Sequence, residues 1–588
     1  MNTIDKSAHC ILFVCILFPS VSSEPSLPKL ERPTLKCLGV HWLVKGPNSQ
    51  RARIQFNYRK NGEEEWQRGL DLFRIETAAI KGQKPPAGST LYAGSIFNLE
   101  EDTEYELELT LRLPNRKPLV HSMVSRTRAE PKAFEGGRKL HVVPGNGGGR
   151  GTRQEPFQGL AAADKAAKPG DIILIHKGDY IGLATFKSSG VPGKPIVWRG
   201  GIDGEVILDG TGDAEKMSSR TITASNIHDV HFEGLTVRRG KFLIVCHRSK
   251  RIVLRYCHLK ECDYGFTCTN NAGGRITNDF YIADNLIEGP SAWPRTKGIE
   301  SARGIQVTGN GHAICFNRIR GFADAIDTFT GPECAAIDIY NNEISEMTDD
   351  GIEMDYSQRN TRCFNNRLTN VFQGISTQPV HGGPVYIFRN AMLNVVASTF
   401  KMNNSPSGAL MIHNTAVKKG MALVQFSGAT VRNTFYRNNL FIGTAGNYAY
   451  ENTSPMKNCD FDYDGFGGGP FKLFMKWNGV RYKSIKDLRS KCPVYRNCIS
   501  VEAAGCFANG LRAPQDAKQR FATDSNDLQL HADSGAVDRG VILNGINDDF
   551  TGKAPTSVLM NSASRSRITD RGRENRIESA DKWRLAFL

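Results

Sequence analysis

One asparagine position recurs along the chain at an almost constant spacing, and this repeat constrains the fold more than any other feature. The intervals are 25, 24, 24, 24 and 25 residues, and the position is occupied by Asn317, Asn342, Asn366, Asn390, Asn414 and Asn439. Each interval holds short runs rich in β-branched residues rather than a helical pattern. A period of about 20–50 residues is typical of solenoids. The repeat therefore predicts a parallel β-helix, with the asparagines hydrogen-bonded from one coil to the next.

The start of the repeat region supports the same fold. Asn285 and then Cys257 and Gly234 extend the column upstream at longer intervals. Residues 154–180 read as a short Ala-rich helix, a Pro-Gly stop and a strand, which predicts a helical cap over the first coil. Residues 139–555 resemble the pectate-lyase-like right-handed parallel β-helix superfamily. That resemblance implies an all-β fold with the β-helix over 139–470, but not one reaction, because the superfamily includes lyases, hydrolases, epimerases and binding proteins.

A separate β domain is expected before the solenoid, over residues 28–130. Its segments 53–58 and 105–111 alternate apolar and polar residues with a period of two, as half-buried strands do. Tyr105 lies where a tyrosine corner would place its ring under one sheet and its hydroxyl against upstream backbone. The segment resembles a fibronectin type III domain, a β-sandwich that positions or binds rather than catalyses.

The two ends of the chain are read differently. Residues 1–23 contain a short apolar run followed by the small residues Val21 and Ser23, which predicts a signal peptide and a secreted, extracellular or periplasmic protein. No other stretch approaches the ~18 apolar residues of a membrane helix, so no membrane span is expected.

Residues 471–555 are interpreted as a strand-turn-helix insert and the closing segment of the β-helix. Residues 556–588 are interpreted as a disordered, polar, basic tail.

Twelve cysteines lie outside the predicted signal peptide. An exported protein can form disulfides, and four of these cysteines are spaced most like a local framework: Cys459, Cys492, Cys498 and Cys506.

Aligning the coils places one polar row beside an apolar one. The apolar column, expected to point inward, consists of Ile326, Ile352, Ile375 and Phe400. The next residue of each strand should point outward, which gives the row Asp327, Glu353, Ser376 and Lys401. A second outward row holds Phe329, Asp355, Gln378 and Asn403, and Asp324, Asp349 and Asp350 come just before these strands.

Stacked carboxylates repel one another unless a cation, a shared proton or a substrate group lies between them. One hypothesis is a Ca²⁺ site formed by Asp327, Glu353 and Asp355, which would bridge to an acidic sugar. A second is a general acid and base for glycoside hydrolysis, drawn from Asp327, Asp350, Glu353 and Asp355. The third is a set of surface acids balanced by Arg359 and Arg362.

Several other residues complete a candidate catalytic face. His381 follows the polar strand in a Gly-rich segment and is expected on a loop that arches over the row as a general base. Lys401 is the rival base or the group that neutralises a substrate carboxylate. Tyr386 is the candidate proton donor and Arg389 the candidate anion clamp. Ser376, Gln378 and Asp350 are the remaining predicted substrate-binding residues.

The formal net charge of +15 favours an acidic partner. The sequence lacks a P-loop, a dinucleotide fingerprint, an HExxH motif and nucleic-acid-reading motifs, so nucleic acid is not expected as a partner. We therefore predict a secreted, monomeric, carbohydrate-active protein, namely a lyase that cleaves an acidic polysaccharide by β-elimination. The alternatives are a glycoside hydrolase with paired carboxylates and a non-catalytic surface binder or adhesin.

Overall fold

The computed structural model describes residues 26–76, 85–210, 218–269, 277–296, 298, 301–331, 333–548, 550 and 552–556. The predicted signal peptide lies outside these residues, as does the predicted basic tail beyond Thr556. Within the described ranges, none of the helices combines the length and the apolar character that a membrane span needs.

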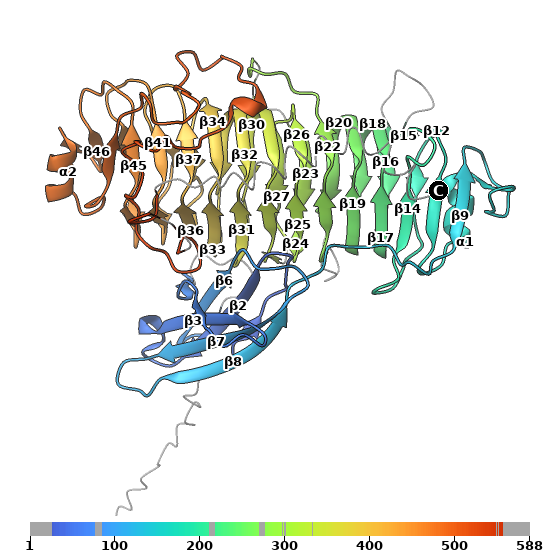
Figure 1. The fold of residues 1–588 in the computed structure, drawn as a ribbon, viewed down its shortest axis with the longest axis horizontal. Coiled ribbons are helices and arrows are strands. Elements are labelled where there is room, and N and C mark those ends of the chain that lie inside the picture. The colour runs from blue at the N-terminus through green and yellow to red at the C-terminus, as the bar shows by residue number, and fades with distance from the viewer. Residues whose placement is uncertain are drawn as a thin grey trace, which may run out of the picture.

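Two long parallel sheets run side by side along the molecule (Figure 1). The first, of 16 strands, extends from β10 (Phe157–Gln158) and β9 (Lys139–Val143) to β43 (Met456–Lys457). The second, of 19 strands, extends from β12 (Gly178–Ile181) to β48 (Ile499–Val501). Successive coils contribute neighbouring strands to each sheet, so the predicted all-β parallel β-helix is confirmed.

The asparagine column forms the predicted hydrogen-bonded ladder. From Asn285 to Asn414, each side-chain Nδ2 donates to the Oδ1 of the next asparagine at 2.9–3.0 Å. The ladder ends at Asp464, whose Oδ1 accepts from Asn439 at 2.9 Å. At the other end, the Cys257 N–H donates to Asn285 at 3.0 Å. The prediction that Gly234 belongs to this column is wrong by one residue. Thr236 pairs with His258 in the register, so Leu235, and not Gly234, lies opposite Cys257.

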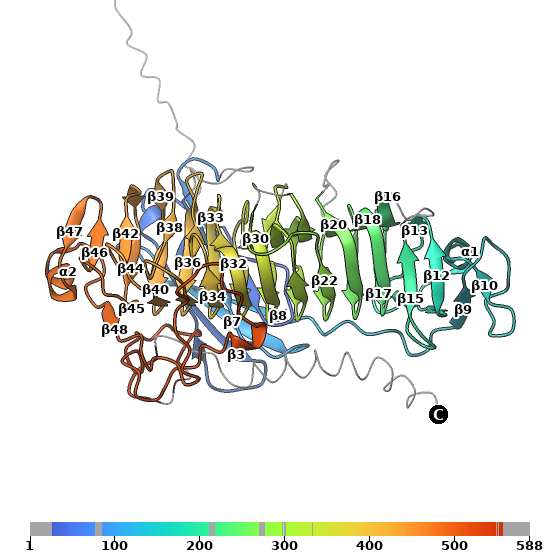
Figure 2. The ribbon, with the colours of Figure 1, turned by 90° about the horizontal axis from the view of Figure 1, so that it is seen from above.

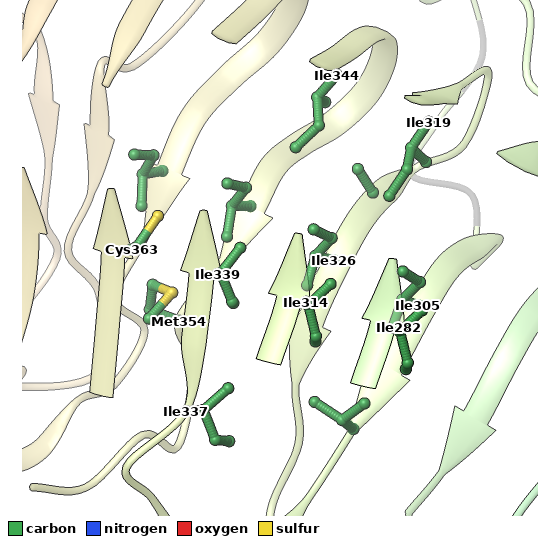
Figure 3. Close-up of a cluster of buried hydrophobic side chains, with 14 of the residues drawn as sticks. Ile282, Ile305, Ile314, Ile319, Ile326, Ile337, Ile339, Ile344, Met354 and Cys363 are labelled. Carbon is green, nitrogen blue, oxygen red and sulfur yellow. The ribbon is translucent and has the colours of Figure 1, made fainter. Parts of the chain in front are cut away.

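The core of the solenoid is a stack of aliphatic side chains between the sheets. Figure 3 shows isoleucines from successive coils, among them Ile305, Ile314 and Ile326, pointing into this space. The predicted cap is present as α1 (Leu160–Ala166), whose Ala163 packs into the core. The opposite end is covered by a strand pair, β46 (Met475–Trp477) and β47 (Val480–Tyr482), and by α2 (Ile485–Lys491).

The N-terminal domain consists of two four-stranded antiparallel sheets, with strand orders β1-β2-β6-β5 and β4-β3-β7-β8. The outer strands are β1 (Lys29–Leu30), β5 (Phe73–Arg74), β4 (Gln67–Arg68) and β8 (Leu119–Arg126). The inner strands are β2 (Leu38–Lys45), β6 (Ser89–Ile96), β3 (Arg53–Lys60) and β7 (Glu104–Arg112). The Tyr105 hydroxyl accepts a hydrogen bond from the Glu100 N–H at 3.0 Å. This is the predicted tyrosine corner.

This domain packs against the first long sheet near the middle of the solenoid (Figures 1 and 2). The ring of Phe97 lies 4.9 Å from that of Tyr386 and 5.1 Å from that of Phe388. Arg362 forms an ion pair with Asp338, and both side chains are fully buried. Thr34 donates to the same carboxylate at 2.5 Å.

The contact corrects one part of the sequence interpretation. Arg359 pairs with Glu31 and Glu333, and Arg362 pairs with Asp338. Neither arginine balances the outward acids, because Arg362 lies on β31 (Thr361–Phe364) of the first sheet and Arg359 in the turn just before it.

All twelve cysteines among the described residues carry free thiols, and eleven of them are buried. The spacing of Cys459, Cys492, Cys498 and Cys506 therefore does not correspond to a local disulfide framework. Burial alone accounts for most of these positions, because free cysteine packs as a small apolar residue.

The segment after β48, residues 502–548, runs back along the solenoid, and we call it the closing strap. Asn526 donates to the Leu368 carbonyl at 2.9 Å, and Asn438 donates to the Val541 carbonyl at 2.8 Å. The strap covers an apolar cluster that includes Leu393, Leu528 and Ala536.

Candidate functional site

The predicted polar row lies on the second long sheet. Four neighbouring strands carry it: β27 (Asp324–Thr328), β30 (Glu343–Glu353), β32 (Arg367–Ser376) and β35 (Phe400–Lys401). The backbone register aligns Asp327, Glu353, Ser376 and Lys401 as one row beside Ile326, Ile352, Ile375 and Phe400. The apolar column is part of the buried core, so the alignment made from the sequence is correct.

The row is much less exposed than an outward-facing row was expected to be. Asp327 is 2% exposed, and Glu353 and Lys401 are each 8% exposed. Arg303, at the start of the neighbouring strand β23 (Arg303–Val307), pairs with Asp324 and Asp327. The row is therefore the floor of a charged site.

Three aspartates form the tightest part of this site. Oxygen atoms of Asp324, Asp349 and Asp350 lie within 4.8 Å of one another, and all three residues are buried. Together with the acids of the two outward rows they form a group that we call the carboxylate cluster: Asp324, Asp327, Asp349, Asp350, Glu353 and Asp355.

Three cationic side chains contact the cluster. Arg303 lies 3.0 Å from oxygens of both Asp324 and Asp327. The Lys401 Nζ lies 2.5 Å from Asp350 and 3.8 Å from Glu353. Arg295 approaches Asp349 at 3.7 Å and stacks 4.4 Å above the ring of Phe372. Six carboxyl groups thus meet only three cationic side chains.

Burial and mutual repulsion shift the titration of the cluster. Burial raises the pKa of Asp324 and of Asp350 well above the ordinary value, and neighbouring carboxylates raise both further. The pKa of Glu353 is raised well above its ordinary value for the same reasons. Burial raises the pKa of Asp355 to about 7. Burial lowers the pKa of Lys401, but Asp350 and Asp349 outweigh that effect and hold it above its ordinary value.

The donor set fits a hard divalent cation at one part of the cluster. Asp350 is fully buried, and its Oδ1 has no hydrogen-bond partner among the described residues. Clustered carboxylate oxygens are the ligands that Ca²⁺ prefers. Asp324, Asp349, Asp350 and the adjacent Glu353 could hold such an ion.

Two of the three metal ligands predicted from the sequence accept two hydrogen bonds each. Asp327 accepts hydrogen bonds from Arg303 at 3.0 Å and from Gln306 at 2.6 Å. Asp355 accepts from the Ser376 hydroxyl at 2.8 Å and from the Gln378 N–H at 2.6 Å. Ser376 and Gln378 are therefore placed to hold Asp355.

His381 does not lie on a loop above the row. It is the first residue of β33 (His381–Phe388) in the first long sheet. The residue is 7% exposed, and its N–H donates to the Ser357 carbonyl at 2.8 Å. Its ring lies 5.9 Å from that of Tyr356, the residue that follows Asp355. His381 thus lies beside Tyr356 at the start of a strand, because the glycines after it continue that strand instead of forming a projecting loop.

Tyr386 and Arg389 lie outside the site. Tyr386 is buried against Phe97 of the N-terminal domain, a position that does not fit a proton donor. Arg389 donates to the Ile546 carbonyl of the closing strap, a position that does not fit an anion clamp at the cluster.

The sequence interpretation missed Arg303, Gln306 and Arg295. The interval between Asn285 and Asn317 is 32 residues, so an insertion hides the register of this coil. In the structure, strand pairing aligns Arg303 with Asp324 and Gln306 with Asp327. Counting back from the asparagine does not locate them either, because Gln306 lies 11 residues before Asn317 whereas its partner Asp327 lies 15 residues before Asn342.

No family model matches the chain. The uncharacterized protein YwoF of Bacillus subtilis (strain 168) is 33% identical over 104 residues, which are 17% of this chain and 22% of that protein. The chain thus spans less than a quarter of that relative's length.

Three solved structures are similar over about three quarters of the chain. The pectate lyase Pel9A has 16% identity and a TM-score of 0.43, over 72% of this chain and 95% of that one. XylC, in a complex with xylose, has 12% identity and a TM-score of 0.43, over 72% and 99%. A family 28 exopolygalacturonase of Yersinia enterocolitica has 10% identity and a TM-score of 0.30, over 74% and 96%. Similarity at this level does not specify the chemistry of this chain.

Proposed function

We propose that this protein cleaves an acidic polysaccharide by β-elimination at the carboxylate cluster. The observation that carries the proposal is the unbalanced charge of a buried site, with six carboxylates against three cations on rigid strands. Buried acids without a cationic partner are costly to ionise, and their pKa values are raised accordingly. A bound cation would replace their protons, and an anionic substrate would then pair with that cation.

Asp324, Asp349, Asp350 and Glu353 are the residues that would hold a Ca²⁺ ion. The bound ion would supply the positive charge that neutralises a uronate carboxylate and makes the neighbouring α-proton more acidic. Arg303 and Arg295 lie at the edge of the carboxylate cluster, where each can pair with a further carboxylate of the polysaccharide.

Lys401 is the candidate base. Its high pKa comes from the unneutralised acids around it, so any ligand that compensates Asp350 and Asp349 will lower that pKa toward the working range of a base. Neutral Lys401 then takes the α-proton, a carbon–carbon double bond forms, the bond to the glycosidic oxygen breaks, and that oxygen takes a proton from solvent. The chain is cut without the addition of water.

The test is to incubate the protein with polygalacturonate, alginate and a neutral glucan, each with calcium or with EDTA. Absorbance of an unsaturated uronate that requires both an acidic chain and calcium supports the proposal. New reducing ends without that absorbance would contradict it.

Glycoside hydrolysis is the second candidate, and one observation favours it. The Asp355 pKa of about 7 and the raised pKa of Glu353 give the cluster carboxyls that stay protonated near neutrality, as a general acid must. Reducing ends that persist in EDTA would support this chemistry instead.

A further inference from the structure

Two aromatic rings lie on the second long sheet on the N-terminal side of the carboxylate cluster. Phe242 belongs to β18 (Thr236–Val245) and Tyr264 to β20 (His258–Cys268). Their rings are stacked, with centroids 4.5 Å apart and an interplanar angle of 19°. Both side chains are partly exposed, whereas Ile244 and Phe266, two residues further along each strand, are buried in the core.

The strand register joins this pair to the site. Five neighbouring strands each contribute one residue to a single row, in which every residue is the register partner of the next: Arg220, Phe242, Tyr264, Arg303 and Asp324. Arg220, at one end, is exposed on β16 (Ser218–Thr223). Parallel strands are about 4.8 Å apart, so Arg220 stands roughly 19 Å from Asp324 along the solenoid axis. The row is continuous with the cluster and contains no gap in the pairing (Figure 1).

The chemistry of the row changes along its length. At the cluster the groups are acidic and suited to a cation, whereas the aromatic pair is flanked by Arg303 on one side and Arg220 on the other. An arginine beside an aromatic ring offers a cation and an apolar surface together. A chain of uronate residues has the complementary character, because each sugar carries one carboxylate and apolar C–H groups.

We infer that the outer face of β16, β18 and β20 binds the acidic polysaccharide on the N-terminal side of the cleavage point. Phe242 and Tyr264 would contact sugar rings, and Arg220 would pair with the carboxylate of a distal residue. The inference rests on the proposed function for the identity of the chain, but it concerns binding, which can be measured without cleavage.

The experiment measures binding and cleavage separately on the full chain. Affinity electrophoresis in gels that contain polygalacturonate or alginate, with calcium, compares the parent with Phe242→Ala/Tyr264→Ala and with Arg220→Ala. Tyr463→Ala, a partly exposed tyrosine near the C-terminal end of the solenoid, is the matched control. We expect about tenfold weaker binding for the double variant, since loss of two aromatic contacts reaches that order, and a smaller loss for Arg220→Ala that disappears at high salt.

The length of the polysaccharide provides the second readout. The double variant should raise KM for long polysaccharides with little change in kcat, and the difference should disappear for oligosaccharides too short to reach both β20 and β18. Unchanged binding in the double variant, or no binding of either acidic polysaccharide by the parent, overturns the inference. Cleavage by a double variant that binds normally would overturn the inference and leave the proposed function standing.

Discussion

Buried ionisable side chains gather in two regions of the molecule, and the pKa values of their acids are shifted in opposite directions. On the first sheet, against the N-terminal domain, Arg362 faces Asp338, and Arg359 faces Glu31 and Glu333. Burial raises the pKa of Glu31, but Arg359 and His41 outweigh it and hold that pKa at about 2. In the carboxylate cluster, on the second sheet, burial raises the pKa of Asp355 to about 7. Equal burial thus gives opposite shifts, and the balance of neighbouring charge decides the direction.

This difference separates a structural role from a functional one. The charges of the interface are paired one against another, Arg362 with Asp338 and Arg359 with Glu31 and Glu333, and they fix how the two domains meet. The cluster is incomplete, and Asp350 keeps one carboxylate oxygen without a hydrogen-bond partner in the described part of the chain. Perturbed pKa values gather at functional sites for this reason.

The largest expected effect comes from breaking the interface. Asp338→Asn leaves Arg362 as an unpaired buried charge, so the free energy of unfolding should fall by about 3–5 kcal/mol, measured by urea unfolding. Asp350→Asn is the matched change in the cluster. Without calcium it should be neutral or stabilising, because burial and the neighbouring acids Asp324 and Asp349 already disfavour the ionised form of Asp350. Equal destabilisation by the two variants would show that the two regions do not differ in charge balance.

Removal of Lys401 should affect turnover and spare the fold. Lys401→Met is expected to lower kcat on the cleaved polysaccharide by a factor of about 10²–10⁴, the usual contribution of a general base. Its far-UV circular dichroism should match that of the parent. Lys419→Met, which changes an exposed lysine, should leave kcat unchanged. Retention of turnover by Lys401→Met would remove Lys401 as the base.

The pH dependence of stability should have opposite signs in the two regions. The pKa of Asp355 is raised from 3.8 to about 7 in the folded protein, so its contribution makes unfolding easier as pH rises through that window. The pKa of Glu31 is lowered from 4.5 to about 2, so its stabilisation is present above 4.5 and is lost as pH falls toward 2.

Thermal unfolding in EDTA measures both contributions. Asp355→Asn should flatten the melting temperature between pH 4 and 7, and Glu31→Gln should flatten it only below pH 4.5. Calcium should raise the melting temperature of the parent by mass action and reduce the slope above pH 4. A parent curve that is the same with and without calcium would argue against a metal at the cluster.

The smallest expected effect concerns His381. Because His381 is 7% exposed and begins a strand of the first sheet instead of projecting on a loop, His381→Ala should change turnover far less than the ~10²-fold minimum expected of a general base. A comparison of pH–rate profiles checks this, since loss of a base would also remove an inflection. A loss as large as that of Lys401→Met would return His381 to the catalytic role predicted from the sequence.

The sequence by itself determined the architecture and one row of the site. A 24–25-residue period and a side-chain period of two are local properties, so they locate the asparagine ladder and align Asp327 with Glu353 and Lys401. The same patterns indicate the tyrosine corner at Tyr105 and the cap at Leu160–Ala166.

Only the tertiary structure decided what the charges do. It placed Tyr386 and Arg362 in a domain interface, kept His381 in a strand, and brought Arg303 over the acids from a coil whose insertion hides its register. Burial also turned a row expected at the surface into a site with raised pKa values. A pKa depends on solvation and on every charge within several ångströms, and those neighbours come from residues that are far apart in the chain.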